Sequence, residues 1–186
     1  MAGQQYDGVH IDLNNCILPD NIVNGKTPSE ADGLDEATET SLRATGCELI
    51  VNAGSLLKLP QTAMATAQVL YQRYFYAKSF VKHDMEVLSM AAIWLASKIE
   101  EDPRRARDVI NVYTRIKQTR DNQEIVPVVV DDAYKRKKDD LVKAERFMLK
   151  ELGFCVHVNH PHKLIVIFTK QILGEGDDSP LVQTAW

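Results

Sequence analysis

The chain contains 186 residues, of which 45% are hydrophobic and 26% are charged. This composition suits a folded domain with flanking segments and excludes a largely disordered chain. The formal net charge of −4 argues against attraction of the whole molecule to nucleic acid or to an anionic membrane. We find no N-terminal signal pattern and no stretch of roughly 20 apolar residues, so we expect an intracellular protein that does not span a membrane.

The first predicted part is an N-terminal arm rich in Asn, Asp, Gly and Pro. Within it, the motif TPSE at residues 27–30 predicts a short helical turn, because Thr caps a helix start and Pro suits the first helical position. Apolar residues then recur at helical spacing over residues 36–58 and again over residues 60–77. We therefore predict two amphipathic helices after the arm.

The third predicted helix, residues 83–101, is apolar on almost every side until it ends in the charged residues KIEE. A helix of this kind is surrounded by other helices, so we place it at the centre of the fold, with Trp94 as a core residue. A shorter helix is predicted after Pro103, over about residues 105–118. The Pro-containing, β-branched stretch EIVPVVVDD after it predicts an extended connection, since it has no second strand to pair with.

Two further helices are predicted over residues 132–152 and 164–173. Gly153 has the position of a C-terminal cap, and Pro161 suits a first helical turn. Five long helices and one short helix indicate an all-α fold. The predicted parts of the chain are an N-terminal arm (residues 1–33), a helical domain (residues 34–173) and a linker (residues 174–186).

The three cysteines, Cys16, Cys47 and Cys155, are odd in number and widely spaced, and they form no C-x-x-C pair. We therefore expect reduced thiols rather than a disulfide framework or a cysteine zinc site.

A cluster of three histidines, His157, His160 and His162, is the best candidate for a metal site. It spans a loop and a helix start, and no acidic ligand of suitable spacing lies near it. The sequence also has no Gly-rich phosphate loop and no G-x-S-x-G motif. We expect no metal, no cofactor and no catalytic site.

Two charged residues stand out, Glu145 and Lys98. Glu145 lies in an apolar stripe, and the residues three and four positions away on either side are Leu, Val or Met. If this face is covered, Glu145 needs a partner elsewhere in the fold, because an unpaired buried carboxylate is costly. Lys98 precedes Glu101 and Asp102 by three and four residues, so spacing alone also allows ordinary surface ion pairs.

Three segments resemble the cyclin box in order and spacing: LRA at residues 42–44, LASKIEE at 95–101 and KAERFMLKELGF at 143–154. Longer stretches, among them SEADGLDEATETSLRATGCELI and GFCVHVNHPHKLIV, are similar to the L-type cyclins of transcription and splicing. The resemblance covers nearly the whole chain. It implies a five-helix cyclin box in which Lys98 and Glu145 contact a cyclin-dependent kinase, with Glu101 close by.

The function implied by this resemblance is that of a non-catalytic subunit that binds and activates a cyclin-dependent kinase of the transcription and splicing group. It implies a nuclear protein acting in RNA polymerase II transcription and pre-mRNA splicing, with splicing factors among its partners. Most cyclins have two boxes, and this chain ends near the start of a second. We therefore expect one of three things: a short isoform, a fragment or an incomplete gene model. A short isoform would be non-activating if one box does not suffice.

The chain departs from the cyclin pattern at two places. Many cyclins carry an Asp that pairs with the Arg matching Arg43, and Gln72 stands there instead. The substrate-docking patch of cell-cycle cyclins loses two large apolar groups at Thr45 and Gly46. We therefore question the internal ion pair of Arg43 and expect no comparable docking groove.

The alternative function is binding of nucleic acid by a cyclin-fold transcription factor, and it rests on a local basic cluster. Its six residues are Arg104, Arg105, Arg107, Arg115, Lys117 and Arg120. A solvated helix face explains the same pattern. We favour that interpretation because the chain is acidic as a whole.

Overall fold

The computed structural model describes residues 5–6, 9–10, 18–173 and 184. The helices of this part are α1 Asp20–Val23, α2 Pro28–Ala31, α3 Glu36–Leu56, α4 Gln61–Ala77, α5 Met85–Ile99, α6 Ala106–Arg120, α7 Asp132–Glu151 and α8 His162–Leu173. The only strands among these residues are β1 Gln5–Tyr6 and β2 Val9–His10, which pair antiparallel. The predicted all-α fold class is confirmed. None of the described helices is long and apolar enough to cross a membrane.

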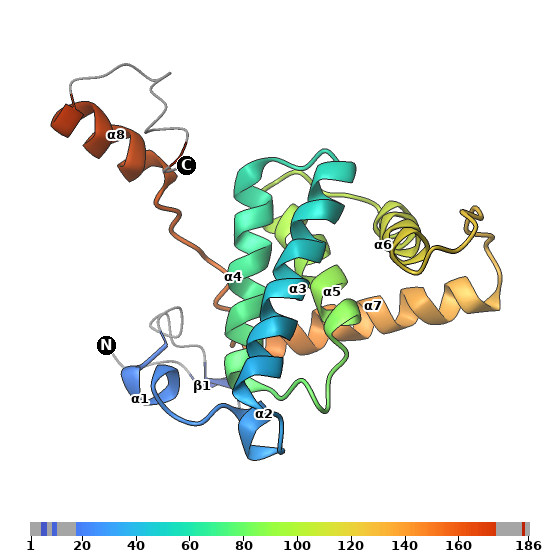
Figure 1. Ribbon diagram of the computed structural model, residues 1–186, viewed down its shortest axis with the longest axis horizontal. Coiled ribbons are helices and arrows are strands. Elements are labelled where there is room, and N and C mark those ends of the chain that lie inside the picture. The colour runs from blue at the N-terminus through green and yellow to red at the C-terminus, as the bar shows by residue number, and fades with distance from the viewer. Residues whose placement is uncertain (1–4, 7–8, 11–17, 174–183, 185–186) are drawn as a thin grey trace.

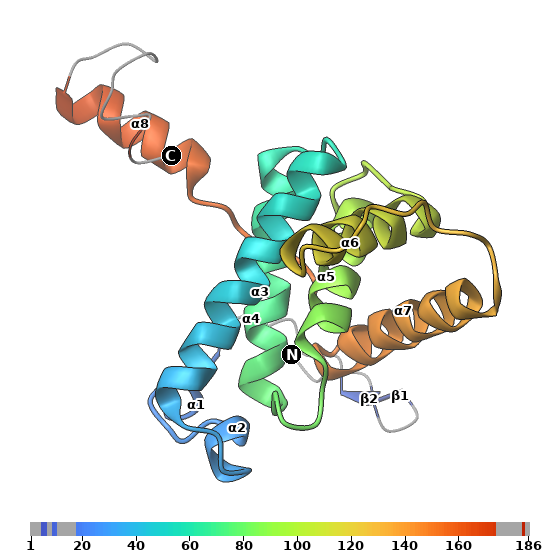
Figure 2. The ribbon, with the colours of Figure 1, turned by 45° about the vertical axis from the view of Figure 1, so that its right-hand side comes forward.

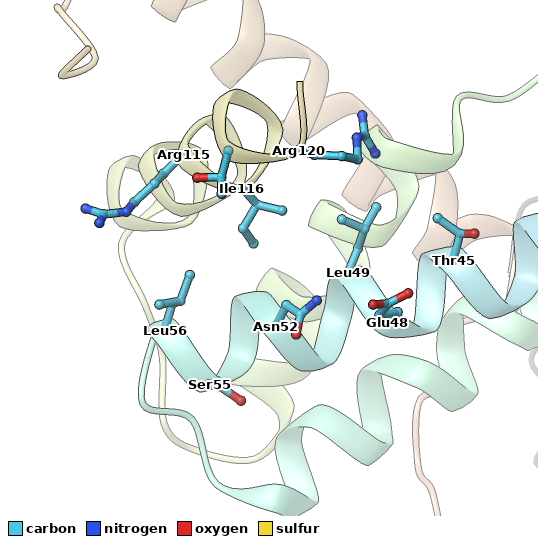
Figure 3. Close-up of a pocket in the computed structure, with 10 residues that line it drawn as sticks. Thr45, Glu48, Leu49, Asn52, Ser55, Leu56, Arg115, Ile116 and Arg120 are labelled. Carbon is cyan, nitrogen blue, oxygen red and sulfur yellow. The ribbon is translucent and has the colours of Figure 1, made fainter. Parts of the chain in front are cut away.

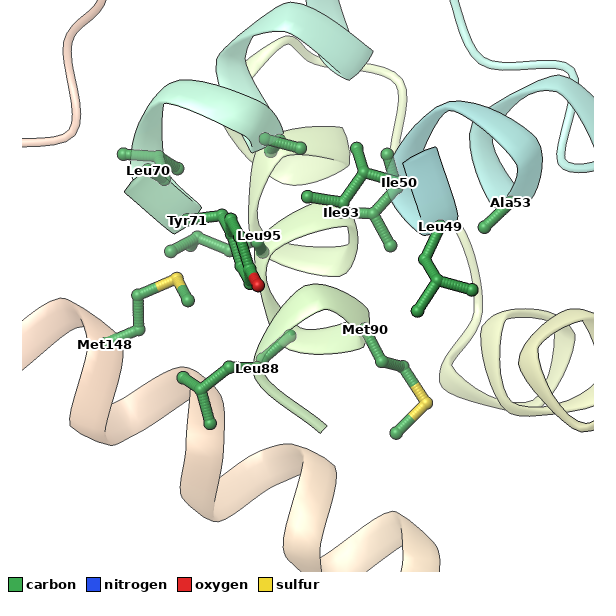
Figure 4. Packing of buried hydrophobic residues seen from close by; sticks show 14 of the residues in the cluster. Leu49, Ile50, Ala53, Leu70, Tyr71, Leu88, Met90, Ile93, Leu95 and Met148 are labelled. Atoms are coloured by element: carbon green, nitrogen blue, oxygen red, sulfur yellow. The ribbon is translucent and has the colours of Figure 1, made fainter. Parts of the chain in front are cut away.

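The bundle consists of α3, α4, α5, α6 and α7, and α5 lies at its centre, in contact with the other four helices (Figure 1). Leucine, isoleucine, methionine and tyrosine side chains from α3, α4, α5 and α7 converge on one core (Figure 4). Within α5, Ala91, Ala92 and Ala96 are fully buried, so the neighbouring helices approach its backbone closely. The prediction of a central apolar helix is confirmed.

Gly46 sets the close packing of α3 against α4. A Cβ atom at this position would lie 2.0 Å from the hydroxyl oxygen of Tyr71 and 2.2 Å from its Cζ atom. Tyr71 is fully buried, and its hydroxyl donates to the backbone oxygen of Leu42 at 3.1 Å. The missing side chain at Gly46 therefore makes room for the ring of Tyr71 in the core.

The described part of the N-terminal arm packs on the bundle through α2. The side chain of Thr27 accepts a hydrogen bond from the backbone N–H of Glu30, which confirms the predicted cap. Ser29 is fully buried, and its Oγ accepts from the N–H of Phe80 at 3.1 Å. The helix α1, with Pro19 at its N-cap and no side-chain cap, was not predicted from the sequence.

After α6, the chain continues through a connection to α7 and then reaches α8. Residues 121–131 contain no helix or strand, as predicted for the connection to α7. The last described helix, α8, lies apart from the bundle (Figures 1 and 2), and its Leu164 and Phe168 are more than half exposed. The predicted linker, residues 174–186, lies outside the described residues except for Thr184.

One cysteine contradicts the expectation of reduced thiols. Cys155 is disulfide-bonded, whereas Cys47 is free. Disulfide formation depends on spatial proximity, and neither the number nor the spacing of the cysteines reports that proximity.

Candidate functional site

The two charged residues singled out from the sequence form an ion pair with each other. Lys98 Nζ lies 2.5 Å from Glu145 Oε1, and this contact joins the last turn of α5 to α7. The Lys98 side chain is 38% exposed and that of Glu145 is 11% exposed. Glu145 thus finds the distant partner that its apolar surroundings required, and Lys98 does not rely on the acids that follow it in sequence.

The ring of Trp94 also contacts the Lys98 ammonium of this ion pair. The ammonium of Lys98 lies 3.4 Å from the centroid of the Trp94 ring, within cation–π range. The indole N–H donates to the backbone oxygen of Arg104 at 3.0 Å. Trp94 is partly buried and packs against the hydrophobic core, as predicted, and its ring in addition meets the Lys98 ammonium at the helix end.

Glu101 is exposed just beyond the C-terminus of α5, where the backbone turns with a positive φ of 57°. This turn is closed by a hydrogen bond from the N–H of Asp102 to the backbone oxygen of Ser97. Partial negative charge gathers at a helix C-terminus, and Lys98 in the last turn complements it. The structure therefore brings Lys98, Glu101 and Glu145 to one end of the central helix.

Arg43 is the centre of a second polar cluster, on α3. Its guanidinium pairs with Glu39 at 2.6 Å and donates to Gln72 Oε1 at 2.9 Å and to the backbone oxygen of Phe75 at 3.0 Å. The questioned ion pair therefore exists, but Glu39 supplies the carboxylate while Gln72 acts as a neutral acceptor. Sequence reasoning missed Glu39, although its position four residues before Arg43 on one helix face was a usable signal.

The Arg43 cluster also holds the arm. The hydroxyl of Thr27 donates to Glu39 Oε2 at 2.5 Å, so one carboxylate joins the N-cap of α2 to Arg43. The Arg43 guanidinium also lies over the ring of Tyr76, 4.5 Å from its centroid. These contacts make the cluster structural: its charges face one another rather than solvent.

The basic cluster around α6 is divided between internal contacts and solvent. Arg104 donates to the backbone oxygens of Leu57 and Lys58 and pairs with Asp102. Lys117 and Arg120 both pair with Glu86 on α5. Arg105, Arg107 and Arg115 are exposed. Half of the proposed nucleic-acid cluster is therefore engaged within the protein.

The histidines of the predicted cluster bond to different partners. His160 Nε2 lies 2.7 Å from the hydroxyl of Thr66, which donates to Glu100 Oε1 at 2.6 Å. His157 Nε2 meets Asn159 Oδ1 at 2.9 Å. Burial lowers the pKa of His160, although Glu100 opposes this shift. Across the described residues, no group of three His, Cys, Asp or Glu side chains is arranged to hold a metal ion.

A cavity of about 550 Å³ lies between α3 and the C-terminal half of α6 (Figure 3). Leu49, Leu56 and Ile116 form its apolar lining, and Arg115 stands at its rim. Thr45, one of the residues that led us to expect no docking groove, also lines it. The sequence did not indicate this cavity because α6, far along the chain, supplies one of its walls.

Comparison with known proteins identifies the family. Residues 21–157 match the family described as the cyclin N-terminal domain. The chain is 59% identical to Cyclin-L2 of Homo sapiens and 58% identical to Cyclin-L1 of Gallus gallus, in each case over 97% of the chain and 34% of the relative. Against Cyclin-L1 of Xenopus laevis, identity is 54% over the whole chain and 37% of the relative. The chain spans about a third of the length of these relatives. It belongs to the cyclin family.

Proposed function

We propose that this chain is the kinase-binding part of a non-catalytic cyclin subunit, and that the end of α5 together with α7 is the surface that meets a cyclin-dependent kinase. The observation that carries the proposal is the pair of Lys98 and Glu145. It places two opposite charges, from helices distant in sequence, at one partly exposed point beside Glu101. The similarity to proteins named Cyclin-L1 and Cyclin-L2 supports a kinase of the transcription and splicing group.

The geometry suits recognition of a partner protein. Lys98 stands in the last turn of α5 and Glu145 lies within α7, and sites on such rigid elements keep their geometry better than sites on loops. Lys98 retains 38% exposure of its side chain, so its ammonium is accessible to a second carboxylate or a backbone oxygen. When a partner covers the pair and excludes water, its charges interact more strongly than at the free surface.

The mechanism is a shift of population in the kinase. A protein kinase is active when the Lys–Glu pair between its strand β3 and its helix αC is closed and its activation loop is ordered. A subunit that binds this active arrangement better than the inactive one raises the population of active kinase. The equilibrium shifts by a free energy equal to the difference between the two binding free energies. The cyclin surface therefore supplies shape and charge, while every reacting group belongs to the kinase.

The domain division and cellular role are part of the same proposal. We place the arm at residues 1–33, the cyclin box at residues 34–173 and a linker toward a second box at residues 174–186. The similarity to Cyclin-L1 and Cyclin-L2 supports a role in the nucleus, in RNA polymerase II transcription and pre-mRNA splicing. Splicing factors are further proposed partners, reached through the assembled kinase complex.

The test is to express the tagged chain in cells, capture it, identify the kinases that co-purify and assay the captured complex for kinase activity. We expect a transcription-group cyclin-dependent kinase in the wild-type sample. The control is the Lys98→Glu, Glu145→Lys double variant, with folding checked by circular dichroism. Capture of an inactive kinase would identify a non-activating form. Absence of any such kinase, with folded wild-type protein, would contradict the proposal.

A further inference from the structure

The aromatic ring beneath Lys98 has a role that core packing does not explain. Trp94 lies four residues before Lys98, so both side chains are on one face of α5. The Lys98 ammonium is 3.4 Å from the ring centroid and 2.5 Å from Glu145 Oε1. The charge is therefore held between a π face and a carboxylate that come from two different helices.

The orientation of the ring is itself fixed. The indole N–H donates to the backbone oxygen of Arg104. The backbone N–H of Arg104 in turn donates to the Oγ of Ser97 at 3.4 Å. The Arg104 guanidinium is bonded to the backbone oxygens of Leu57 and Lys58 at the end of α3. The segment between α5 and α6 is thereby tied to α3, and it sets the plane in which Trp94 presents its face to Lys98.

We propose that Trp94 is a positioning residue, which holds the Lys98 ammonium at Glu145 in the conformation that the kinase binds. This inference rests on the function proposed above. It gives Trp94, which is not one of the three charged residues Lys98, Glu101 and Glu145, a role in kinase binding. A lysine side chain has many rotamers, and restricting it on binding costs free energy. An aromatic face that attracts the ammonium imposes the restriction before the partner arrives.

The proposal distinguishes two substitutions that fill the same site. Trp94→Leu keeps an apolar side chain but removes the π face. Trp94→Phe keeps a smaller π face and loses the indole N–H bond to Arg104. We expect Trp94→Leu to weaken kinase binding by roughly 2- to 10-fold, the range for one immobilised flexible side chain, and Trp94→Phe to recover most of that loss.

The first experiment uses the free chain and needs no kinase. In the NMR spectrum of the wild type, the ε-CH₂ protons of Lys98 should lie upfield of those of other lysines, because they sit in the ring current of Trp94. Lys98→Arg assigns the signal by its disappearance. The shift should vanish in Trp94→Leu and persist in Trp94→Phe. Lys98 signals at ordinary lysine positions in the wild type would overturn the proposal.

The second experiment measures binding of a purified cyclin-dependent kinase in a double-mutant cycle. Trp94→Leu should lose affinity when Lys98 is present and lose nothing further in a Lys98→Met background, with folding of each variant checked by its thermal midpoint. An equal loss in both backgrounds would show that Trp94 acts by packing alone and would contradict the proposal. If the wild type binds no kinase, the proposed function fails, and the ring-current result still decides whether Trp94 holds Lys98.

Discussion

Lys98 and Glu145 are 47 residues apart in sequence, yet the ammonium of one lies 2.5 Å from the carboxylate of the other. Their contact joins the last turn of the central helix α5 to α7, which packs extensively against α5. A buried carboxylate without a partner would destabilise α7 on the face that packs on α5. The pair therefore serves the fold and at the same time fixes two charges at the surface proposed to meet the kinase.

Gly46→Ala should destabilise the fold, against the usual benefit of replacing glycine within a helix. The new Cβ would lie 2.0 to 2.7 Å from ring and hydroxyl atoms of Tyr71, a fully buried residue, so the packing around it would have to shift. We expect a loss of about 1–3 kcal/mol or more in the free energy of unfolding, measured by urea denaturation. The exposed Ser41→Ala on the same helix is the control, and a Gly46→Ala protein as stable as that control would contradict the packing described.

Arg43→Met should be strongly destabilising, because it keeps most of the volume of the side chain but removes its charge and its donors. Glu39, with only 4% of its side chain exposed, would lose its counter-charge. Breaking a buried pair in this way costs about 3–5 kcal/mol. Lys135→Met, which breaks an exposed ion pair, should change stability by no more than about 0.5 kcal/mol. Equal effects of the two substitutions on the thermal midpoint would refute the structural role of Arg43.

Ser29→Ala tests whether the arm contributes to stability. The Oγ of Ser29 accepts the N–H of Phe80, and its loss leaves a buried donor unpaired. The expected decrease in the free energy of unfolding is about 1–3 kcal/mol. Ser55→Ala, at an exposed position of α3, provides the comparison in the same denaturation experiment. No difference between the two variants would mean that α2 does not contribute to the stability of the bundle.

Stability should decrease on mild acidification. Burial lowers the pKa of His160 and of His83 below the ordinary value of 6.5, so the unfolded chain binds protons that the folded state binds less well. The contribution of these two neutral histidines to the stability of the fold is complete above pH 6.5, and it is lost as the pH falls below that value. Glu100 and His162 act on His160 with opposite signs, and the hydroxyl of Thr66 lies at Nε2.

Denaturation with urea at pH 7.5 and at pH 5.5 measures this dependence. The wild type should lose stability at the lower pH, and His160→Gln should lose less of it. Because the Thr66 hydroxyl donates its one proton to Glu100, it accepts from the Nε2–H of neutral His160, and the glutamine amide can replace that donor. A wild-type protein that becomes more stable between pH 7.5 and pH 5.5 would contradict the assignment.

Local patterns were sufficient to predict the described helices other than α1. The apolar period predicted α3, α4 and α7, and the residues around Thr27 predicted the cap of α2. Each of these signals is contained in a few consecutive residues. The single turn α1 has no side-chain cap, and no local signal marked it.

The site could be predicted only in part, because its geometry depends on residues that are far apart in the sequence. The apolar stripe around Glu145 indicated that a partner must exist, but not that the partner is Lys98. The hydrogen bond from Trp94 to the backbone oxygen of Arg104 crosses the turn after α5. Arg104 itself was assigned to a basic surface, because its acceptors on α3 come from a different part of the chain. Such contacts follow from packing, which periodicity does not encode.

The most direct test of the account is the affinity of a cyclin-dependent kinase for the wild type, for Lys98→Glu, for Glu145→Lys and for the double variant that exchanges the two charges. The exchange preserves an internal ion pair, so it separates stability of the fold from recognition by the kinase. We predict that all three variants lose about 2–5 kcal/mol of binding free energy, and that the double variant does so while keeping a higher thermal midpoint than either single variant. Wild-type affinity in the folded double variant would contradict the proposal that these two charges meet the kinase.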